Sequence, residues 1–262
     1  MKKPVAWTLA LAAALGIAAL VYYQARDLPP EPQPEPSPPV AAAPPAPQAS
    51  VEPTIRYPIE AEEKPLPPLN ASDDAMKEAL AGLLGEPSLL ELLHLDAFVR
   101  RVVATIDNLP RKKLAPRLMP VKPAAGPFLT AGNDGTLVLN PQNYARYSAY
   151  VRLLDAIDSR KLVALYTRYY PLFQQAYWDL GYPGAYFNDR LVEVIDDVLI
   201  APEVEGPIKL VRPKIYYRYA DPELEALPAG QKILVRIGPE NAAKVKAKLR
   251  EIRSELVKAP TR

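Results

Sequence analysis

The sequence predicts a mainly α-helical protein in three parts: one N-terminal transmembrane helix, a disordered Pro-rich linker and a compact helical domain with one or two small β-hairpins. An uncharged apolar run, a concentration of proline and a long region of helical periodicity lead to this prediction. The expected divisions are a cytoplasmic N-terminus (1–4), a transmembrane signal-anchor helix (5–23), the linker (24–68), the helical domain (69–258) and a flexible C-terminus (259–262).

The apolar run VAWTLALAAALGIAALVYY carries no charged residue. As a helix it would span about 28 Å, close to the roughly 30 Å of a hydrocarbon core. Lys2 and Lys3 precede it, which predicts a cytoplasmic N-terminus and a C-terminal domain outside the cytoplasm. A cleaved signal peptide is the alternative, because Gly16 and Ala18 are small. The run continues to Tyr23, and this extra length favours an uncleaved anchor.

Proline dominates the next segment, since 15 of the 32 prolines lie between Pro29 and Pro68. Proline removes backbone donors and favours the polyproline II conformation, so neither helix nor sheet is expected here. The segment also has an excess of Glu over basic residues, which opposes collapse. We interpret it as a spacer, and a Pro-motif ligand for another protein is the alternative.

The composition excludes several classes of function. The chain has no Cys, which rules out disulfides, a thiolate nucleophile and Cys-ligated metals. Its only histidine, His94, lies in an apolar run without the spacing of a catalytic triad. The formal charge of +2 comes from residues 1–28, so the remainder is neutral and nucleic-acid binding is not expected.

Caps and apolar periodicity predict the elements of the domain. We expect helices at 73–84, across 88–109, from Asn140-Pro141 to about Ile157, from Ser159 to Gly181, from an Asn188 cap to about 199, after Asp221-Pro222 and from Gly238-Pro239 onward. Gly181 is expected in the left-handed conformation that commonly follows a helix. A hairpin is expected about Asn133-Asp134-Gly135, and a short extended pair within PIKLVRPKIYYRYA.

The stretch YYPLFQQAYWDLGYPGAYFNDRLVEVIDD holds the densest set of aromatic and acidic residues. Tyr169, Phe173 and Tyr177 follow the apolar stripe and are expected in the core. Trp178 lies off this stripe, and we expect it to pack under the 182–187 loop. The alternative is a contact surface, formed with Tyr182 and Tyr186, for a partner or a sugar ring.

Three acids, Asp189, Glu193 and Asp196, share one face of the following helix. A carboxylate-bridged metal site or a hydrolytic site would need further acids from other helices, usually with a Glu-x-x-His motif, which the chain lacks. A solvated face is therefore favoured for these acids. The same interpretation is given to the basic C-terminal segment 244–262. We expect no cofactor, no metal and no catalytic residue.

Five stretches carry a resemblance to a known family: LPPLNASDDAMKEAL, RRVVATIDNLPRKKLAPRL, YPLFQQAYWDLGYPGAYFNDRLVEVIDDVL, PEVEGPIKLVRPKIYYRYADPELEAL and AGQKILVRIGPENAAKVKAKLREIRSEL. In these the chain resembles domain of unknown function family 3014, a bacterial, proteobacterial family. The resemblance implies a single-pass protein of the Gram-negative inner membrane with a periplasmic domain. It implies no activity, ligand or catalytic residue.

The layout of anchor, linker and domain leads to a hypothesis about function. We expect a protein-interaction or scaffold module of the cell envelope, with Trp178, Tyr182, Tyr186, Asp189, Glu193 and Asp196 as its candidate contact surface. A carboxylate-based metal-binding or hydrolytic domain and a peptidoglycan-binding module are the alternatives.

Overall fold

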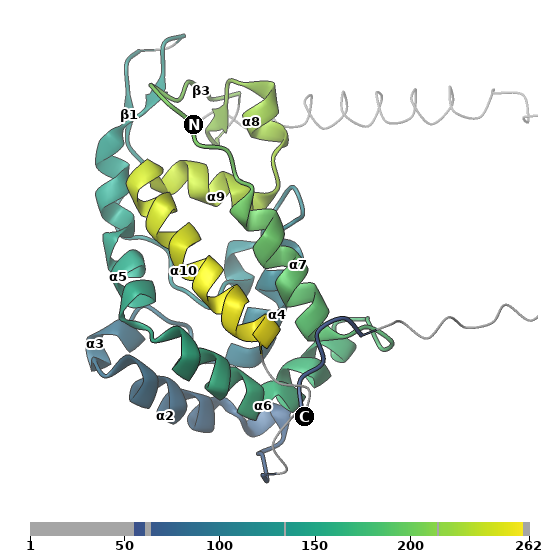
Figure 1. The fold of residues 1–262 in the computed structure, drawn as a ribbon. Helices are drawn as coiled ribbons and strands as arrows, with labels where there is room; N and C mark the ends of the chain where they lie inside the picture. Colours follow the sequence, from purple (N-terminus) through teal and green to yellow (C-terminus); the bar gives the residue numbers. More distant parts are fainter. Residues whose placement is uncertain (1–54, 61–63, 134, 214, 259–262) are drawn as a thin grey trace, which may run out of the picture. The chain divides into compact units, whose positions relative to one another are not determined.

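A computed structural model describes residues 55–60, 64–133, 135–213 and 215–258 of the chain (Figure 1). The expected transmembrane helix, the linker as far as residue 54 and the last four residues lie outside this part. Within the described ranges, none of the helices combines the length and the apolar character that crossing a membrane requires.

Helices make up most of the described residues, as the sequence predicts. The α-helices are α2 (Asp73–Leu84), α3 (Pro87–Leu90), α4 (Phe98–Asn108), α5 (Ser148–Ala156), α6 (Ser159–Asp179), α7 (Phe187–Leu199), α8 (Pro222–Ala226), α9 (Ala229–Ile237) and α10 (Pro239–Lys258). Short 3-10 helices lie at Leu69–Ala71, Pro116–Leu118 and Pro141–Tyr147.

Two small antiparallel hairpins confirm the extended segments expected from the sequence. Strand β1 (Thr130–Ala131) pairs with β2 (Val138–Leu139), and β3 (Leu210–Val211) pairs with β4 (Arg218–Tyr219). The hairpins meet, because the amide of Leu139 donates to the carbonyl of Ile208. They cover a small cluster of apolar side chains at the end of the domain nearest α9.

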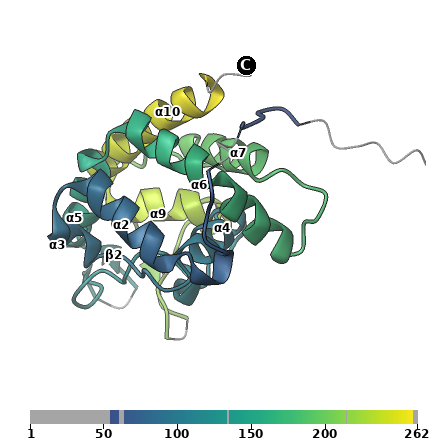
Figure 2. The same ribbon diagram turned by 90° about the horizontal axis from the view of Figure 1, so that it is seen from below.

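Helix α10 lies across one face of the domain and contacts α5, α6, α7 and α9 (Figures 1 and 2). Helix α4 lies against α6 and α7 on the other side. The main core joins α2, α4, α6, α7 and α10, and a second cluster joins α7, α9 and α10. The apolar stripes predicted for α6, α7 and α10 therefore do face a common interior.

The corner between α6 and α7 holds the aromatic core. Tyr166 lies 5.2 Å from Phe173 between ring centroids, and Phe173 stacks on the fully buried Phe187 at 6.1 Å. Asp158 caps the start of α6, because its side chain accepts from the amide of Lys161. Gly181 follows the C-cap residue of α6, and its φ of 114° confirms the expected left-handed position after the helix.

The single helix expected across 88–109 is wrong, because the chain breaks between α3 and α4. Ala97 adopts a left-handed conformation with φ of 48° just before α4. The Asp73 carboxylate accepts from the amides of Ala97 and Phe98, at 2.7 and 3.1 Å, so a residue of α2 caps α4. The amide of His94 donates to the carbonyl of Pro120, and this bond joins the segment between α3 and α4 to the loop that follows α4. Helical periodicity does not record these long-range bonds.

Two further elements differ from the expectation. Helix α9 was not expected as a separate element, although its Leu234 and Val235 are buried. The helix expected from Asn140 begins as a 3-10 turn and becomes α-helical only at Ser148. Asn140 itself caps that turn by accepting from the amide of Gln142, as predicted.

The folded domain begins earlier than the predicted boundary at residue 69. Residues 55–60, assigned to the disordered linker, lie against α7 with Ile59 buried. The Asp189 carboxylate accepts from the amides of Arg56 and Tyr57, at 2.9 and 2.8 Å. The proline content of the sequence predicted disorder for this segment. Its order depends instead on hydrogen bonds to residues more than a hundred positions away.

A pair of glycine substitutions tests the α6 terminus. A Cβ at Gly181 or Gly184 meets no neighbouring atom, and only Gly181 has a positive φ. Gly181→Ala should therefore destabilise the domain by about 1–2 kcal/mol through backbone strain alone, whereas Gly184→Ala should melt close to the parent. Thermal unfolding followed by circular dichroism measures both. Equal melting temperatures for the two variants would contradict the left-handed assignment.

Candidate functional site

A groove at the α6–α7 corner collects five of the six residues of the predicted contact surface: Trp178, Tyr182, Tyr186, Asp189 and Glu193. Its volume is about 790 Å³. We call it the aromatic groove. The remaining lining comes from Ile55, Arg56, Asp107, Gln174, Tyr177, residues 183–185 and Arg190. Asp196 lies outside it.

The loop between α6 and α7 shapes this groove, and one buried amide holds the loop. The Nε2 of Gln174 donates to the carbonyl of Ala185 at 2.8 Å. Its Oε1 accepts from the amide of Phe187 at 2.9 Å and from the hydroxyl of Tyr170 at 2.6 Å. Gln174 therefore caps the first turn of α7 from the neighbouring helix.

Trp178 stands at the rim of the groove with 48% of its surface exposed. The expectation that it packs under the 182–187 loop is therefore wrong. Its Nε1 donates to the carbonyl of Ala185 at 3.3 Å, which ties only the polar edge of the indole to the loop. The space beneath the loop is already filled by Tyr177, whose ring stacks on Tyr182 at 4.7 Å.

Asn188 does not cap α7, and this prediction is also wrong. The helix begins at Phe187, which places Asn188 in its first turn, fully buried. Its Nδ2 donates to the carbonyl of Tyr57 at 2.8 Å, and its Oδ1 accepts from the hydroxyl of Tyr166. Tyr186 adds a bond from the amide of Ile59 to its hydroxyl at 2.6 Å. The first turn of α7 thus binds residues 56–59.

A network of charges forms the floor of the groove. The Asp107 carboxylate on α4 is buried and accepts from the Arg111 guanidinium at 2.6 Å and from the Tyr182 hydroxyl at 3.3 Å. Arg190 on α7 lies 3.4 Å from the same carboxylate and donates to the Asp107 carbonyl at 3.1 Å. Burial, and next the Asp107 charge, raise the pKa of the Tyr177 hydroxyl, which stays protonated.

The three acids of α7 bind three different partners. Asp189 accepts from the backbone of residues 56 and 57, Glu193 pairs with Arg190 at 3.2 Å, and Asp196 pairs with Arg253 on α10. Across the described residues, no three His, Cys, Asp or Glu side chains are grouped so as to hold a metal ion. The structure therefore does not assemble these acids into the carboxylate site considered as an alternative.

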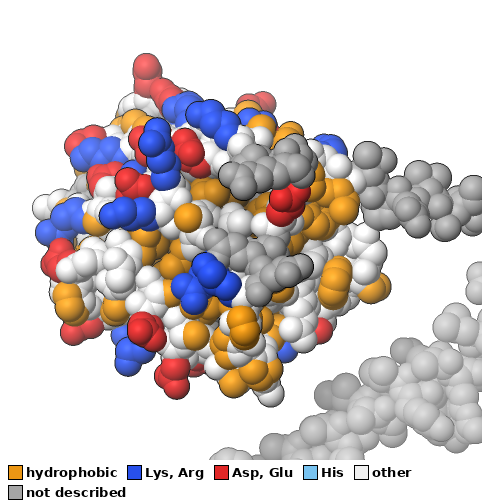
Figure 3. Space-filling view, turned by 60° about the horizontal axis from the view of Figure 1, so that its bottom comes forward, with side chains coloured by type: hydrophobic (Ala, Val, Ile, Leu, Met, Phe, Trp, Pro, Cys, Tyr) orange, Lys and Arg blue, Asp and Glu red, His pale blue; other side chains and the backbone are white. Residues whose placement is uncertain are grey.

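The basic face of α10 is only partly solvated. Lys246 is buried and donates to the carbonyl of Ala201 at 2.7 Å, and Lys248 donates to the carbonyl of Ile157 at 3.0 Å. These ammonium groups bind chain carbonyls from neighbouring segments. His94 is half-buried, and its Nδ1 lies 3.9 Å from the Asp96 carboxylate. Lys, Arg, Asp and Glu side chains are interspersed over the face seen in Figure 3, with no large area of one sign.

The chain belongs to a family described as protein of unknown function (DUF3014), whose profile matches residues 98–253. The match spans α4 to α10 and includes the groove residues from Asp107 to Glu193. No curated protein matches the chain, and no solved structure matches it.

The docking of residues 56–59 can be tested by proteolysis of the full chain. Each oxygen of the Asp189 carboxylate accepts from one amide, and Asp189→Asn replaces one of these oxygens with an NH2 donor, so the segment should open more often. We expect trypsin to cleave after Arg56 roughly tenfold faster, which corresponds to about 1.4 kcal/mol of local stability. Glu193→Gln, one turn along on the same helix face, is the control. Unchanged cleavage in Asp189→Asn would show that these bonds do not hold the segment.

Proposed function

We propose that this protein is a single-pass inner-membrane protein whose periplasmic helical domain binds another protein of the cell envelope through the aromatic groove. The exposed indole of Trp178 above a floor of paired charges is the observation that carries this proposal. The apolar run and the Pro-rich segment of the sequence support the anchor and the spacer.

The groove has the composition of a protein-binding hot spot. Binding energy at protein interfaces concentrates in Trp, Tyr and Arg side chains that lie in pockets and lose water on binding. Trp178, Tyr182 and Arg190 stand together here. Because Asp107 and Glu193 together neutralise Arg111 and Arg190 within the domain, a partner needs no strong charge of its own. We expect an apolar or aromatic side chain of the partner to lie on the indole.

The end of the Pro-rich spacer lies beside the aromatic groove. Residues 55 and 56 line the groove, and the next residues are fixed to α7 by Asp189 and Asn188. A chain leaving the domain toward its N-terminus therefore starts beside the proposed binding surface. A partner in the groove would contact the end of the spacer as well as the helices.

Site-specific photocrosslinking in living cells tests the partner hypothesis. A photoreactive phenylalanine analogue in place of Trp178 should give an adduct with a single envelope protein. The same analogue in place of Tyr216, which is 80% exposed in the β3–β4 loop, serves as the control at a more accessible aromatic position outside the groove. The adducts are identified by mass spectrometry after purification of the full-length protein.

The outcomes separate the hypotheses. An adduct from position 178 that position 216 lacks supports a protein partner. The same adducts from both positions, or none from 178, would contradict it. Retention of the full-length protein on purified cell wall, abolished by Trp178→Ala, would instead identify the peptidoglycan alternative, in which a sugar ring stacks on the indole.

A topology measurement tests the location independently of the groove. A reporter enzyme that is active only in the periplasm, fused after Arg262, should be active if residues 5–23 form the anchor and Lys2 and Lys3 stay in the cytoplasm. A cytoplasm-only reporter at the same position should be silent. Activity of the second fusion would reverse both the topology and the location.

A further inference from the structure

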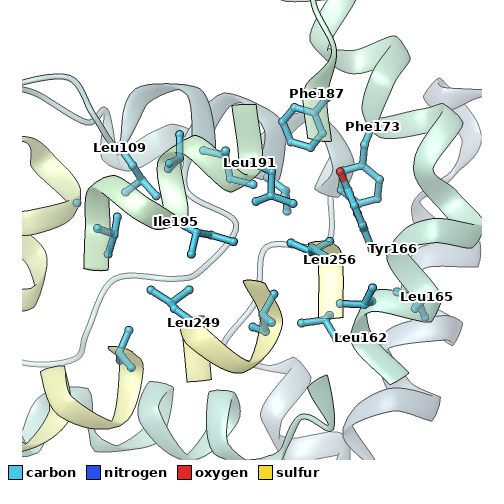
Figure 4. Close-up of a pocket in the computed structure, with 18 of the residues that line it drawn as sticks. Leu109, Leu162, Leu165, Tyr166, Phe173, Phe187, Leu191, Ile195, Leu249 and Leu256 are labelled. Carbon is cyan, nitrogen blue, oxygen red and sulfur yellow. The ribbon is translucent and has the colours of Figure 1, made fainter. Parts of the chain in front are cut away.

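The interior of the domain contains an apolar cavity of about 440 Å³ between α4, α6, α7, α9 and α10. Figure 4 shows Leu191 and Ile195 of α7, Leu249 and Leu256 of α10 and the aromatic rings of α6 projecting toward this common space. Every lining residue is apolar except Tyr166 and Gly230. The hydroxyl of Tyr166 is turned away to Asn188, so it offers the cavity no hydrogen bond.

A space of this size is unusual in a close-packed core. Protein interiors contain few voids larger than a water molecule. Ile106, Leu191, Ile233 and Leu249 belong to the core clusters and yet are only half-buried, and all four line the cavity. The lining gives water no polar partner, which leaves an apolar molecule as the stable occupant.

A second cavity, of about 540 Å³, adjoins the first and leads to the surface. The two share Ile233 and Leu234 of α9 and Val245 of α10 as lining residues. Most of the second lining is also apolar, from α5, α9 and the loop at 116–124. Lys122 and Arg236 lie at its exposed end. The two cavities therefore form an apolar path from the surface toward the centre of the domain. The side chains of Ile233, Leu234 and Val245 stand between them.

The mouth of this path is cationic. Lys122, Arg146 and Arg236 line the second cavity, whose lining includes no Asp or Glu. All three nitrogens of the Arg146 guanidinium already donate, to the carbonyls of Ala124, Ala125 and Gly126 and to the Asn143 side chain, whereas Arg236 lies over the Phe128 ring at 5.7 Å. In the described part of the chain, none of the three cations forms an ion pair with a carboxylate.

We infer that the domain binds a long-chain fatty acid, with its alkyl chain in the two cavities and its carboxylate among Lys122, Arg146 and Arg236. Lys122 and Arg236 provide the charge-assisted hydrogen bonds that a carboxylate requires, and Arg146, already bonded to the chain, adds positive charge beside them. The inner cavity is roughly three times the size of the 150 Å³ apolar cavity that accommodates benzene, so it has room for an alkyl chain on the order of a dozen carbons. This site is separate from the aromatic groove and does not depend on the proposed partner.

Photolabelling of the full-length protein in lipid nanodiscs tests the inference. The probe is a fatty acid with a diazirine in mid-chain and a free carboxylate. After irradiation and digestion, we expect the label on peptides of α9 and α10 that contain Ile233 and Val245. Excess unlabelled palmitate should remove it. Label confined to residues 5–23 or to the outer surface, or label that palmitate does not displace, would overturn the inference.

Two pairs of variants separate binding of the fatty-acid carboxylate from binding of its alkyl chain. Lys122→Gln with Arg236→Gln should lower labelling by the acid about tenfold, as expected for lost hydrogen bonds to a charged group, and should leave labelling by the matching long-chain alcohol unchanged. Lys77→Gln with Arg250→Gln removes two exposed cations elsewhere and should change neither. Equal losses for acid and alcohol in the first pair would overturn the placement of the carboxylate.

Val245→Phe is the steric test, because it adds bulk where the two cavities meet. The variant should abolish labelling of the inner cavity by acid and alcohol alike. Its circular dichroism melt shows whether it folds. Should it fail to fold, the Lys122→Gln, Arg236→Gln pair, which changes only exposed side chains, still decides the question. A folded Val245→Phe with full labelling at Ile233 would overturn the proposed path.

Discussion

The buried amide of Gln174 is the interaction on which the α6–α7 corner depends. It accepts from the buried amide of Phe187, which would otherwise lack a partner, and donates to the carbonyl of Ala185, which it shares with Trp178. By binding residues 185 and 187 at the α7 end of the loop, it fixes the position from which Phe187 enters the core. It also holds the Ala185 carbonyl where the indole of Trp178 can donate to it. The position of Phe187 in the core and the shape of the groove therefore depend on the same three hydrogen bonds of Gln174.

The second constraint is the segment that precedes the helices. Residues 56–59 satisfy Asn188 and Asp189 and place Ile59 in the core. Buried Asn188 has a partner at each end of its amide, one in the segment and one on Tyr166. Because a buried amide without partners is costly, removal of the segment would leave the first turn of α7 unsatisfied. The N-terminal segment is thus part of the domain although its composition is that of a linker.

Periodicity and caps were enough to predict most helices, both hairpins and the left-handed Gly181, because these features arise from residues close in sequence. Trp178, Tyr182 and Tyr186 line one groove, and their role as a contact surface stays a prediction. The errors have the opposite origin. The break before α4, the role of Asn188 and the start of the domain all depend on hydrogen bonds between distant segments. A local pattern contains no record of such partners.

Asp107 and Arg190 show why the charged floor of the groove escaped prediction. Each has a neighbour in the sequence that lines the apolar cavity. Ile106 precedes Asp107, and Leu191 follows Arg190. Consecutive residues on a helix point about 100° apart, so one side of the same turn can face the cavity while the other faces the groove. The two helices α4 and α7 are therefore the wall between an apolar interior and a polar surface site. An isolated charge beside an apolar stripe looks like a solvated residue in the sequence, and only the approach of the second helix turns it into half of a buried pair.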